Sequence, residues 1–126
     1  MSEAPVAVPR VKAWLVSRSG PSAGNRYLLP DGVTRVGRNP DNDVVIAGPE
    51  AAVVSLYHLE ITKGRTGCRI RDLGSTNGTY VNGQRISEAE LRAHAVIQLG
   101  PEGPEFGFIV EESRQSELER TMVIPK

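Results

Sequence analysis

The fold is indicated most clearly by the stretch Asp72-Leu73-Gly74-Ser75-Thr76-Asn77-Gly78-Thr79-Tyr80-Val81-Asn82-Gly83. Its two Asn-Gly pairs are separated by a short, strand-like Thr-Tyr-Val run. Asn-Gly accepts positive φ at little cost and is typical of hairpin turns, so we predict two tight turns around a strand. Small polar residues packed this tightly also leave backbone N–H groups free to meet a ligand. We find no catalytic acid, base or activated nucleophile in the stretch, which indicates binding rather than catalysis.

Short strands separated by turns extend from this stretch toward both termini. Residues 58–63 and 67–72 alternate apolar and polar side chains, as half-buried strands do. Further strands are expected at residues 12–17, 25–29, 33–37, 43–47, 79–81, 85–86, 95–99 and 105–110. The one helix-like piece is 87–93, where Ser87 can cap a turn with Glu90 three residues on. The pattern predicts an all-β sandwich of short, mainly antiparallel strands.

Composition limits the function further. The 126 residues fit one domain, and 15 basic residues balance 15 acidic ones, so no global charge favours nucleic acid or an anionic membrane. Cys68 is the one cysteine and is expected to be a small buried side chain. Without disulfide or metal-ligand spacing, we expect a cytoplasmic setting and no metal or cofactor. We divide the chain into a flexible leader (1–10), a folded domain (11–111) and a flexible tail (112–126); no apolar run reaches transmembrane length.

Five motifs follow one another between these strands. In order they are Gly37-Arg38, Asn42-Asp43 before an apolar strand, Ser55-x-x-His58, the run 72–79, and Asn82-Gly83. This series resembles the forkhead-associated (FHA) domain, a phosphothreonine-peptide-binding β-sandwich of about eleven strands, over about residues 11–111.

The resemblance implies a role for each matching residue. Arg38, Ser55 and Thr76 match the phosphate contacts of the family, and Asn77 matches its clamp on the peptide backbone. Phosphothreonine carries nearly two negative charges and strong acceptor oxygens. The Arg38 guanidinium, the Ser55 hydroxyl and N–H, and the Thr76 hydroxyl are suitable donors, while the Asn77 amide can both donate and accept. Residues expected to brace the site are Gly37, His58, Gly78 and Asn82.

Plainer interpretations of these residues stay open at this point. Arg38 can be an exposed arginine that pairs with Asp41 or Asp43, and Ser55 can be a turn or cap residue. Thr76 and Asn77 can serve hairpin geometry alone. For His58 we favour a hydrogen-bonding brace over catalysis. Arg69 and Arg71 are expected on a solvated strand face, the alternative being a wider positive rim.

The sequence departs from the FHA pattern in three places. Leu56 stands where the family usually has a polar residue that helps to hold the phosphate. The segment between Asp43 and Ser55 is longer than usual, and its extra part brings Glu50 near the expected phosphate. The turn before the penultimate strand is His94-Ala95 in place of Gly-Asp, which we interpret as a local variation.

The sequence thus predicts a phosphothreonine-dependent interaction module, without enzymatic activity, that recruits a phosphorylated Ser/Thr kinase or its substrate. The alternative is a degenerate FHA fold that acts as a phospho-independent scaffold or self-association module. We also hypothesise that Thr121, followed by an apolar residue three positions later, is phosphorylated and docks into an FHA pocket of the same or another copy. The alternative is an ordinary tail. Neither nucleic acid nor a membrane is an expected partner.

Overall fold

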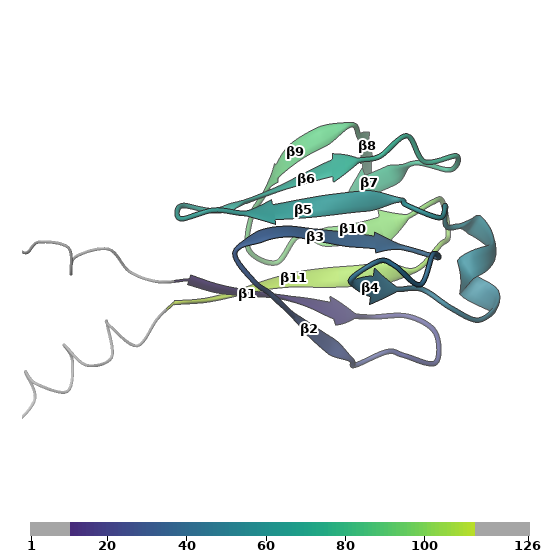
Figure 1. Ribbon diagram of the computed structural model, residues 1–126, viewed down its shortest axis with the longest axis horizontal. Helices are drawn as coiled ribbons and strands as arrows, with labels where there is room; N and C mark the ends of the chain where they lie inside the picture. Colours follow the sequence, from purple (N-terminus) through teal and green to yellow (C-terminus); the bar gives the residue numbers. More distant parts are fainter. Residues whose placement is uncertain (1–10, 113–126) are drawn as a thin grey trace, which may run out of the picture.

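Alternation along the strands places every second side chain in a core shared by two β-sheets (Figure 1). In β1, for example, Ala13, Leu15 and Ser17 are buried and the residues between them are partly exposed. The computed structural model describes residues 11–112. Its elements are β1 (Val11–Ser17), β2 (Arg26–Leu29), β3 (Gly32–Gly37), β4 (Val44–Val45), the 3-10 helix η2 (Pro49–Val53), β5 (Leu59–Lys63), β6 (Cys68–Asp72), β7 (Thr79–Val81), β8 (Gln84–Ile86), β9 (Glu88–Leu91), β10 (Val96–Leu99) and β11 (Glu105–Glu112).

The strand order explains how the chain closes on itself. One sheet has the order β2-β1-β11-β10-β7-β8 and the other β4-β3-β5-β6-β9. Neighbouring strands are antiparallel except for the pair β3–β4, which is parallel. The predicted all-β sandwich is therefore confirmed.

The core between the sheets consists of aliphatic and aromatic side chains. Its largest fully buried members include Phe108, Leu15, Leu59, Ile70 and Leu99, each worth about 1.5–3 kcal/mol on full burial. Cys68 is buried as predicted, and burial raises the pKa of its thiol.

The helical turn predicted at residues 87–93 is wrong. Glu88–Leu91 forms β9, which pairs with β6 and covers that edge of the five-stranded sheet. Leu91 is buried, and Arg69 of β6 donates to the carboxylate of Glu88 at 3.1 Å. Pairing with a distant strand satisfies more backbone and side-chain groups than one capped turn does.

Only the second Asn-Gly pair makes the predicted hairpin. Asn82 (φ 51°) and Gly83 (φ 84°) join the antiparallel strands β7 and β8, as a turn with two positive φ values should. The hairpin predicted at Asn77-Gly78 is wrong, because β6 and β7 belong to different sheets. Residues 73–78 are instead a crossover from one sheet to the other.

The segment between β3 and β5 also differs in detail. Strand β4 covers only Val44–Val45 of the expected 43–47, and the longer segment after it contains η2, which the sequence pattern did not predict. Within residues 11–112, no helix is long and apolar enough to cross a membrane, and no group of His, Cys, Asp and Glu side chains is arranged to hold a metal. The predicted leader lies outside the described residues, as does the predicted tail with Thr121 apart from Glu112, which is the last residue of β11.

Candidate functional site

The residues predicted to contact the ligand lie on three loops at the end of the sandwich where β3 and β6 finish and β5 begins (Figure 1). These are the β3–β4 loop with Arg38, the β4–β5 loop with Ser55, and the β6–β7 loop with Thr76 and Asn77. The turn between β5 and β6 lies at the opposite end of the same strands (Figure 1). Residues far apart in sequence thus meet at one end of a rigid scaffold.

Gly37 allows the first two loops to touch. A Cβ at this position would overlap with the backbone carbonyl of Leu56 and would lie 2.9 Å from Nδ2 of Asn42. Next to this close approach of Gly37 and Leu56, the backbone N–H of Arg38 donates to the carbonyl of Ser55 at 3.1 Å. A side chain at Gly37 would separate Arg38 from Ser55.

The Arg38 side chain is anchored at its base and open at its tip. Its Nε donates to the carbonyl of Val54 at 2.6 Å, and the residue is exposed. Asp41 accepts instead from the Tyr57 hydroxyl (3.1 Å) and Asp43 from the backbone N–H of Arg35 (2.9 Å). No ion pair to Arg38 occurs among residues 11–112, so the alternative of pairing with Asp41 or Asp43 is not what the structure shows.

His58 lies beneath the loops and connects two of them. Its Nδ1 accepts from the backbone N–H of Ser55 at 3.1 Å, and its Nε2–H donates to the carbonyl of Gly78 at 2.8 Å. The residue is 0% exposed, and burial lowers the pKa of its imidazole despite the bond to Gly78 and the nearby Asp72 carboxylate. This arrangement requires a neutral ring with its proton on Nε2. One buried ring thus connects the backbone of Ser55 to the backbone of Gly78.

The same contact changes what Ser55 can offer. We expected the Ser55 N–H as a ligand donor, but it is used by His58. The Ser55 hydroxyl oxygen accepts from the backbone N–H of Thr76 at 3.1 Å. Its own proton can still be donated, so Ser55 contributes a hydroxyl that the third loop holds in place.

Asp72, which we had not assigned to the site, organises the β6–β7 loop. One carboxylate oxygen accepts from the N–H groups of Gly74 and Ser75 at 3.0 Å, and the other accepts from the hydroxyls of Ser75 (2.6 Å) and Thr79 (2.7 Å). Desolvation acts to raise the pKa of Asp72, but these hydrogen bonds outweigh it and lower the pKa overall. The sequence did contain a signal for this role: Asp72 precedes Gly74 by two residues and Ser75 by three, the spacing at which an Asp side chain accepts from the backbone N–H groups that follow it.

Thr76 and Asn77 follow Ser75 in the same β6–β7 loop. Thr76 is exposed, whereas Asn77 is partly buried and donates one amide N–H to the carbonyl of Val53 in η2 at 2.9 Å. Gly78 follows with φ 90°, and a Cβ there would lie 2.7 Å from Nε of Arg85. The Asn77 amide thus keeps one N–H and its oxygen beyond the bond to Val53, fewer groups than the two-way clamp we expected.

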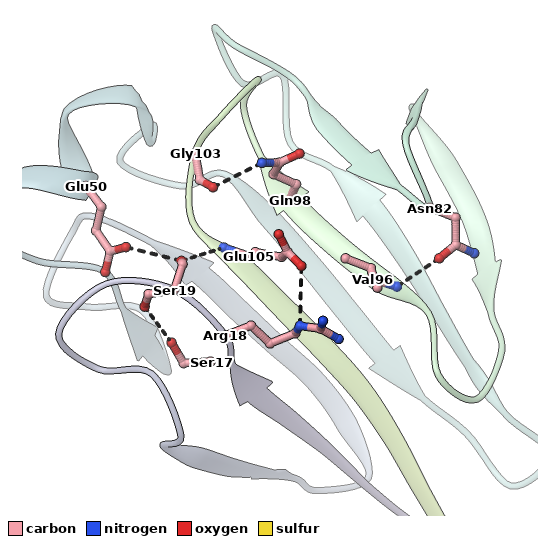
Figure 2. A network of polar contacts seen from close by, with 9 residues as sticks. All are labelled: Ser17, Arg18, Ser19, Glu50, Asn82, Val96, Gln98, Gly103 and Glu105. Carbon is pink, nitrogen blue, oxygen red and sulfur yellow. Dashed lines mark hydrogen bonds and ion pairs between the residues drawn. The ribbon is translucent and has the colours of Figure 1, made fainter.

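Two further residues, Asn82 and Glu50, make contacts other than those we expected (Figure 2). Asn82 accepts from the backbone N–H of Val96 at 2.9 Å, so it fixes the β7–β8 turn to β10 rather than bracing the three loops. Glu50 accepts from the Ser19 hydroxyl at 3.5 Å, and its carboxylate lies against Gly20 in the β1–β2 turn. The additional carboxylate in the longer segment is thus held by another loop.

Arg69 and Arg71 belong to the solvated strand face, as we favoured. Arg69 pairs with Glu88 at 3.1 Å and Arg71 with Glu60 at 2.8 Å. Arg35 approaches Glu60 from the neighbouring strand at 3.7 Å. Since each arginine has a carboxylate partner on this face, they do not widen a positive rim around Arg38.

Fold and site together define an all-β sandwich that presents polar and cationic loop residues at one end. The family model of the FHA domain matches residues 34–100, and the chain belongs to the FHA domain family. It is similar to an FHA domain solved in work on phosphothreonine-dependent FHA domain interactions (33% identity, 78% of this chain and 95% of that one, TM-score 0.69). It is also similar to Mycobacterium tuberculosis EmbR in complex with a low-affinity phosphopeptide (34% identity, 78% of this chain and 24% of that one, TM-score 0.67).

Two curated relatives are regulatory proteins by name. The glycogen accumulation regulator GarA of Mycobacterium tuberculosis is 37% identical over 93 residues, which cover 74% of this chain and 56% of GarA. The oxoglutarate dehydrogenase inhibitor of Corynebacterium glutamicum is 34% identical over 93 residues, 74% of this chain and 63% of that protein. The chain spans somewhat over half the length of these relatives.

Proposed function

We propose that the loop end of this domain binds a phosphothreonine segment of a partner protein. The observation that carries the proposal is the joining of Arg38, Ser55 and Thr76 through short loop contacts. The N–H of Arg38 donates to the carbonyl of Ser55, and the N–H of Thr76 donates to the Ser55 hydroxyl, both at 3.1 Å. Three residues whose side chains carry donors suited to phosphate are therefore neighbours, although they come from three loops.

The chemistry of these groups favours phosphate over a carboxylate. A phosphothreonine carries about −1.5 to −2 charges at pH 7 and three acceptor oxygens. The exposed guanidinium end of Arg38 can donate two parallel hydrogen bonds. The hydroxyls of Ser55 and Thr76 supply one more donor each, so each phosphate oxygen finds a partner.

Asn77 is proposed to hold the peptide backbone beside the phosphothreonine. Its bond to Val53 fixes the orientation of the amide and leaves an oxygen and one N–H for the ligand. His58 is proposed to brace the site and takes no part in chemistry, because both of its ring nitrogens are bonded to backbone groups. We therefore propose recognition rather than catalysis.

The partner that fits this site is a phosphorylated Ser/Thr kinase or one of its substrates, in the cytoplasm. Support comes from the solved relatives, whose descriptions concern phosphothreonine-dependent interactions and a bound phosphopeptide. Support for a regulatory role comes from the two curated relatives.

The test is a calorimetric titration with a peptide selected from a degenerate phosphothreonine library, alongside its unphosphorylated form. We expect binding of the phosphorylated form alone and a loss of at least about thirtyfold for Arg38→Ala, since removing one partner of a charged hydrogen-bonded pair costs about 2–5 kcal/mol. The matched control is Arg65→Ala, an exposed arginine in the turn between β5 and β6, which should leave binding unchanged. Equal binding of both peptide forms would contradict the proposal and favour the phospho-independent scaffold.

The proposal extends to Thr121 as a ligand within the same chain. Thr121 comes nine residues after the end of β11 at Glu112, a reach of about 30 Å if extended. Phosphorylation of Thr121 should then reduce binding of an added phosphopeptide, and Thr121→Ala should remove that reduction. An affinity that does not change with phosphorylation would rule out self-binding.

A further inference from the structure

Leu56, the departure from the FHA pattern beside Ser55, is held in an exposed position by its own backbone. Its carbonyl accepts from the N–H of Asn39 at 3.1 Å and from Nδ2 of Asn42 at 2.7 Å. Asn42 is buried, and its Nδ2 also donates to the carbonyl of Asn39 at 2.8 Å. The glycine at position 37 makes room for this same carbonyl. The backbone of Leu56 is thus one of the most constrained points of the loop.

The side chain at this constrained point nevertheless faces solvent. Leu56 is 47% exposed, and the next residue, Tyr57, is 40% exposed, while many other large apolar side chains enter the core. The Tyr57 hydroxyl donates to Asp41 at 3.1 Å, which holds the ring against the β3–β4 loop. Two neighbouring side chains with large apolar surfaces are therefore exposed, and hydrogen bonds to the β3–β4 loop hold the Leu56 backbone and the Tyr57 hydroxyl.

Ser55 and the two residues after it contact different neighbouring loops. The Ser55 hydroxyl is held by Thr76 of the β6–β7 loop, whereas Leu56 and Tyr57 contact residues 39–42 of the β3–β4 loop. Ser55 therefore contacts the loop that carries Thr76 and Asn77. The two residues after it contact the β3–β4 loop, which carries Arg38.

We propose that Leu56 and Tyr57 form an apolar subsite that selects an aliphatic or aromatic ligand residue close to the phosphothreonine, on the side away from Asn77. The inference rests on the proposed function and deepens it, because it states which phosphothreonine segments the site prefers. The Leu56 side chain offers no hydrogen-bond donor to the phosphate, so its contribution to the ligand is apolar contact. Water leaves this surface only when an apolar residue of the ligand covers it.

The experiment is a phosphothreonine library with randomised flanking positions, screened with the wild-type protein and with Leu56→Ala and Tyr57→Ala. Wild type should enrich apolar residues at a flanking position, and Leu56→Ala should abolish that enrichment while phosphate-dependent binding persists. For a single peptide with the preferred apolar residue, affinity should fall about fivefold in Leu56→Ala, the usual effect of covering about half a leucine side chain. The same variant should bind the matching peptide with serine at that position as tightly as wild type does.

Leu28→Ala is the matched control, because Leu28 is an equally exposed leucine (50%) on β2 of the other sheet. It should leave the preference profile unchanged. An unchanged profile in both Leu56→Ala and Tyr57→Ala, or a wild-type profile without apolar preference, overturns the subsite while the phosphothreonine proposal stands. A wild-type protein that binds phosphorylated and unphosphorylated libraries equally overturns the proposed function itself.

Discussion

Replacement of His58 by alanine tests the internal architecture of the site. The imidazole is 0% exposed and forms two hydrogen bonds, one from the Ser55 N–H and one to the Gly78 carbonyl. In His58→Ala the Gly78 carbonyl keeps its bond from the N–H of Gly100 at 2.9 Å. The Ser55 N–H loses its acceptor, and a cavity replaces the ring.

The magnitude follows from these two losses. A buried cavity of this size costs about 2 kcal/mol or more, and a buried donor without a partner costs about 1–3 kcal/mol. We expect His58→Ala to lower the free energy of unfolding by about 4 kcal/mol, a large part of the about 5–15 kcal/mol of a typical domain. The melting temperature should fall by at least about 15 °C.

Urea unfolding followed by the fluorescence of Trp14, the one tryptophan, measures this change directly. The matched control is His94→Asn, because His94 is exposed and has φ 71°, which asparagine tolerates. The control should lie within about 0.5 kcal/mol of wild type. A loss below about 1 kcal/mol for His58→Ala would contradict this prediction, since the ring would then hold neither loop.

Three further predictions concern the same loops. Burial lowers the pKa of His58 in the folded protein, so as the pH falls the imidazole is protonated in the unfolded chain before it is protonated in the folded one. The free energy of unfolding should therefore fall as the pH drops below about 6.5. Urea unfolding at several pH values should show a smaller fall in His58→Gln. Gly37→Ala, whose Cβ would overlap with the Leu56 carbonyl, should lower the free energy of unfolding by about 3 kcal/mol, and a loss below about 1 kcal/mol would contradict the required close approach. Asp72→Asn keeps the shape but turns an amide toward the N–H groups of Gly74 and Ser75; we expect a loss of about 2 kcal/mol and faster hydrogen exchange at both amides, and exchange as slow as in wild type would count against the role of Asp72.

Local patterns were sufficient wherever a strand or turn depends on its own residues. Alternation at residues 58–63 and 67–72 predicted the strands β5 and β6. In β5 the polar Glu60 is buried as well, where it pairs with Arg71 and Arg35. The Asn82-Gly83 hairpin depends on two positive φ values that this pair adopts easily.

Local sequence patterns gave wrong predictions where contacts with residues distant in the sequence determine the structure. Asn77-Gly78 carries the same hairpin signal as Asn82-Gly83. Its loop, however, is held by hydrogen bonds from Ser75 to Asp72 and from His58 to Gly78, and the chain crosses to the other sheet. Residues 87–93 carry a capping signal, yet the edge of β6 offers backbone partners about twenty residues away.

The same distinction applies to the candidate site. The resemblance of the motif series to the FHA pattern predicted that residues 38, 55 and 76 belong to one site, and their loops do contact one another through backbone groups. The use of the Ser55 N–H by His58 was not predictable, since it depends on the orientation of a buried ring.

The most direct test of the account is an amide NMR titration of the isotopically labelled protein with a phosphothreonine peptide. We predict the largest shifts at the amides of Arg38, Ser55, Thr76 and Asn77, with none at residues 64–67 in the turn between β5 and β6. The unphosphorylated peptide should cause no shifts at equal concentration. Shifts confined to the sheet faces, or equal shifts with both peptides, would contradict the claim that these loops form a phosphothreonine site.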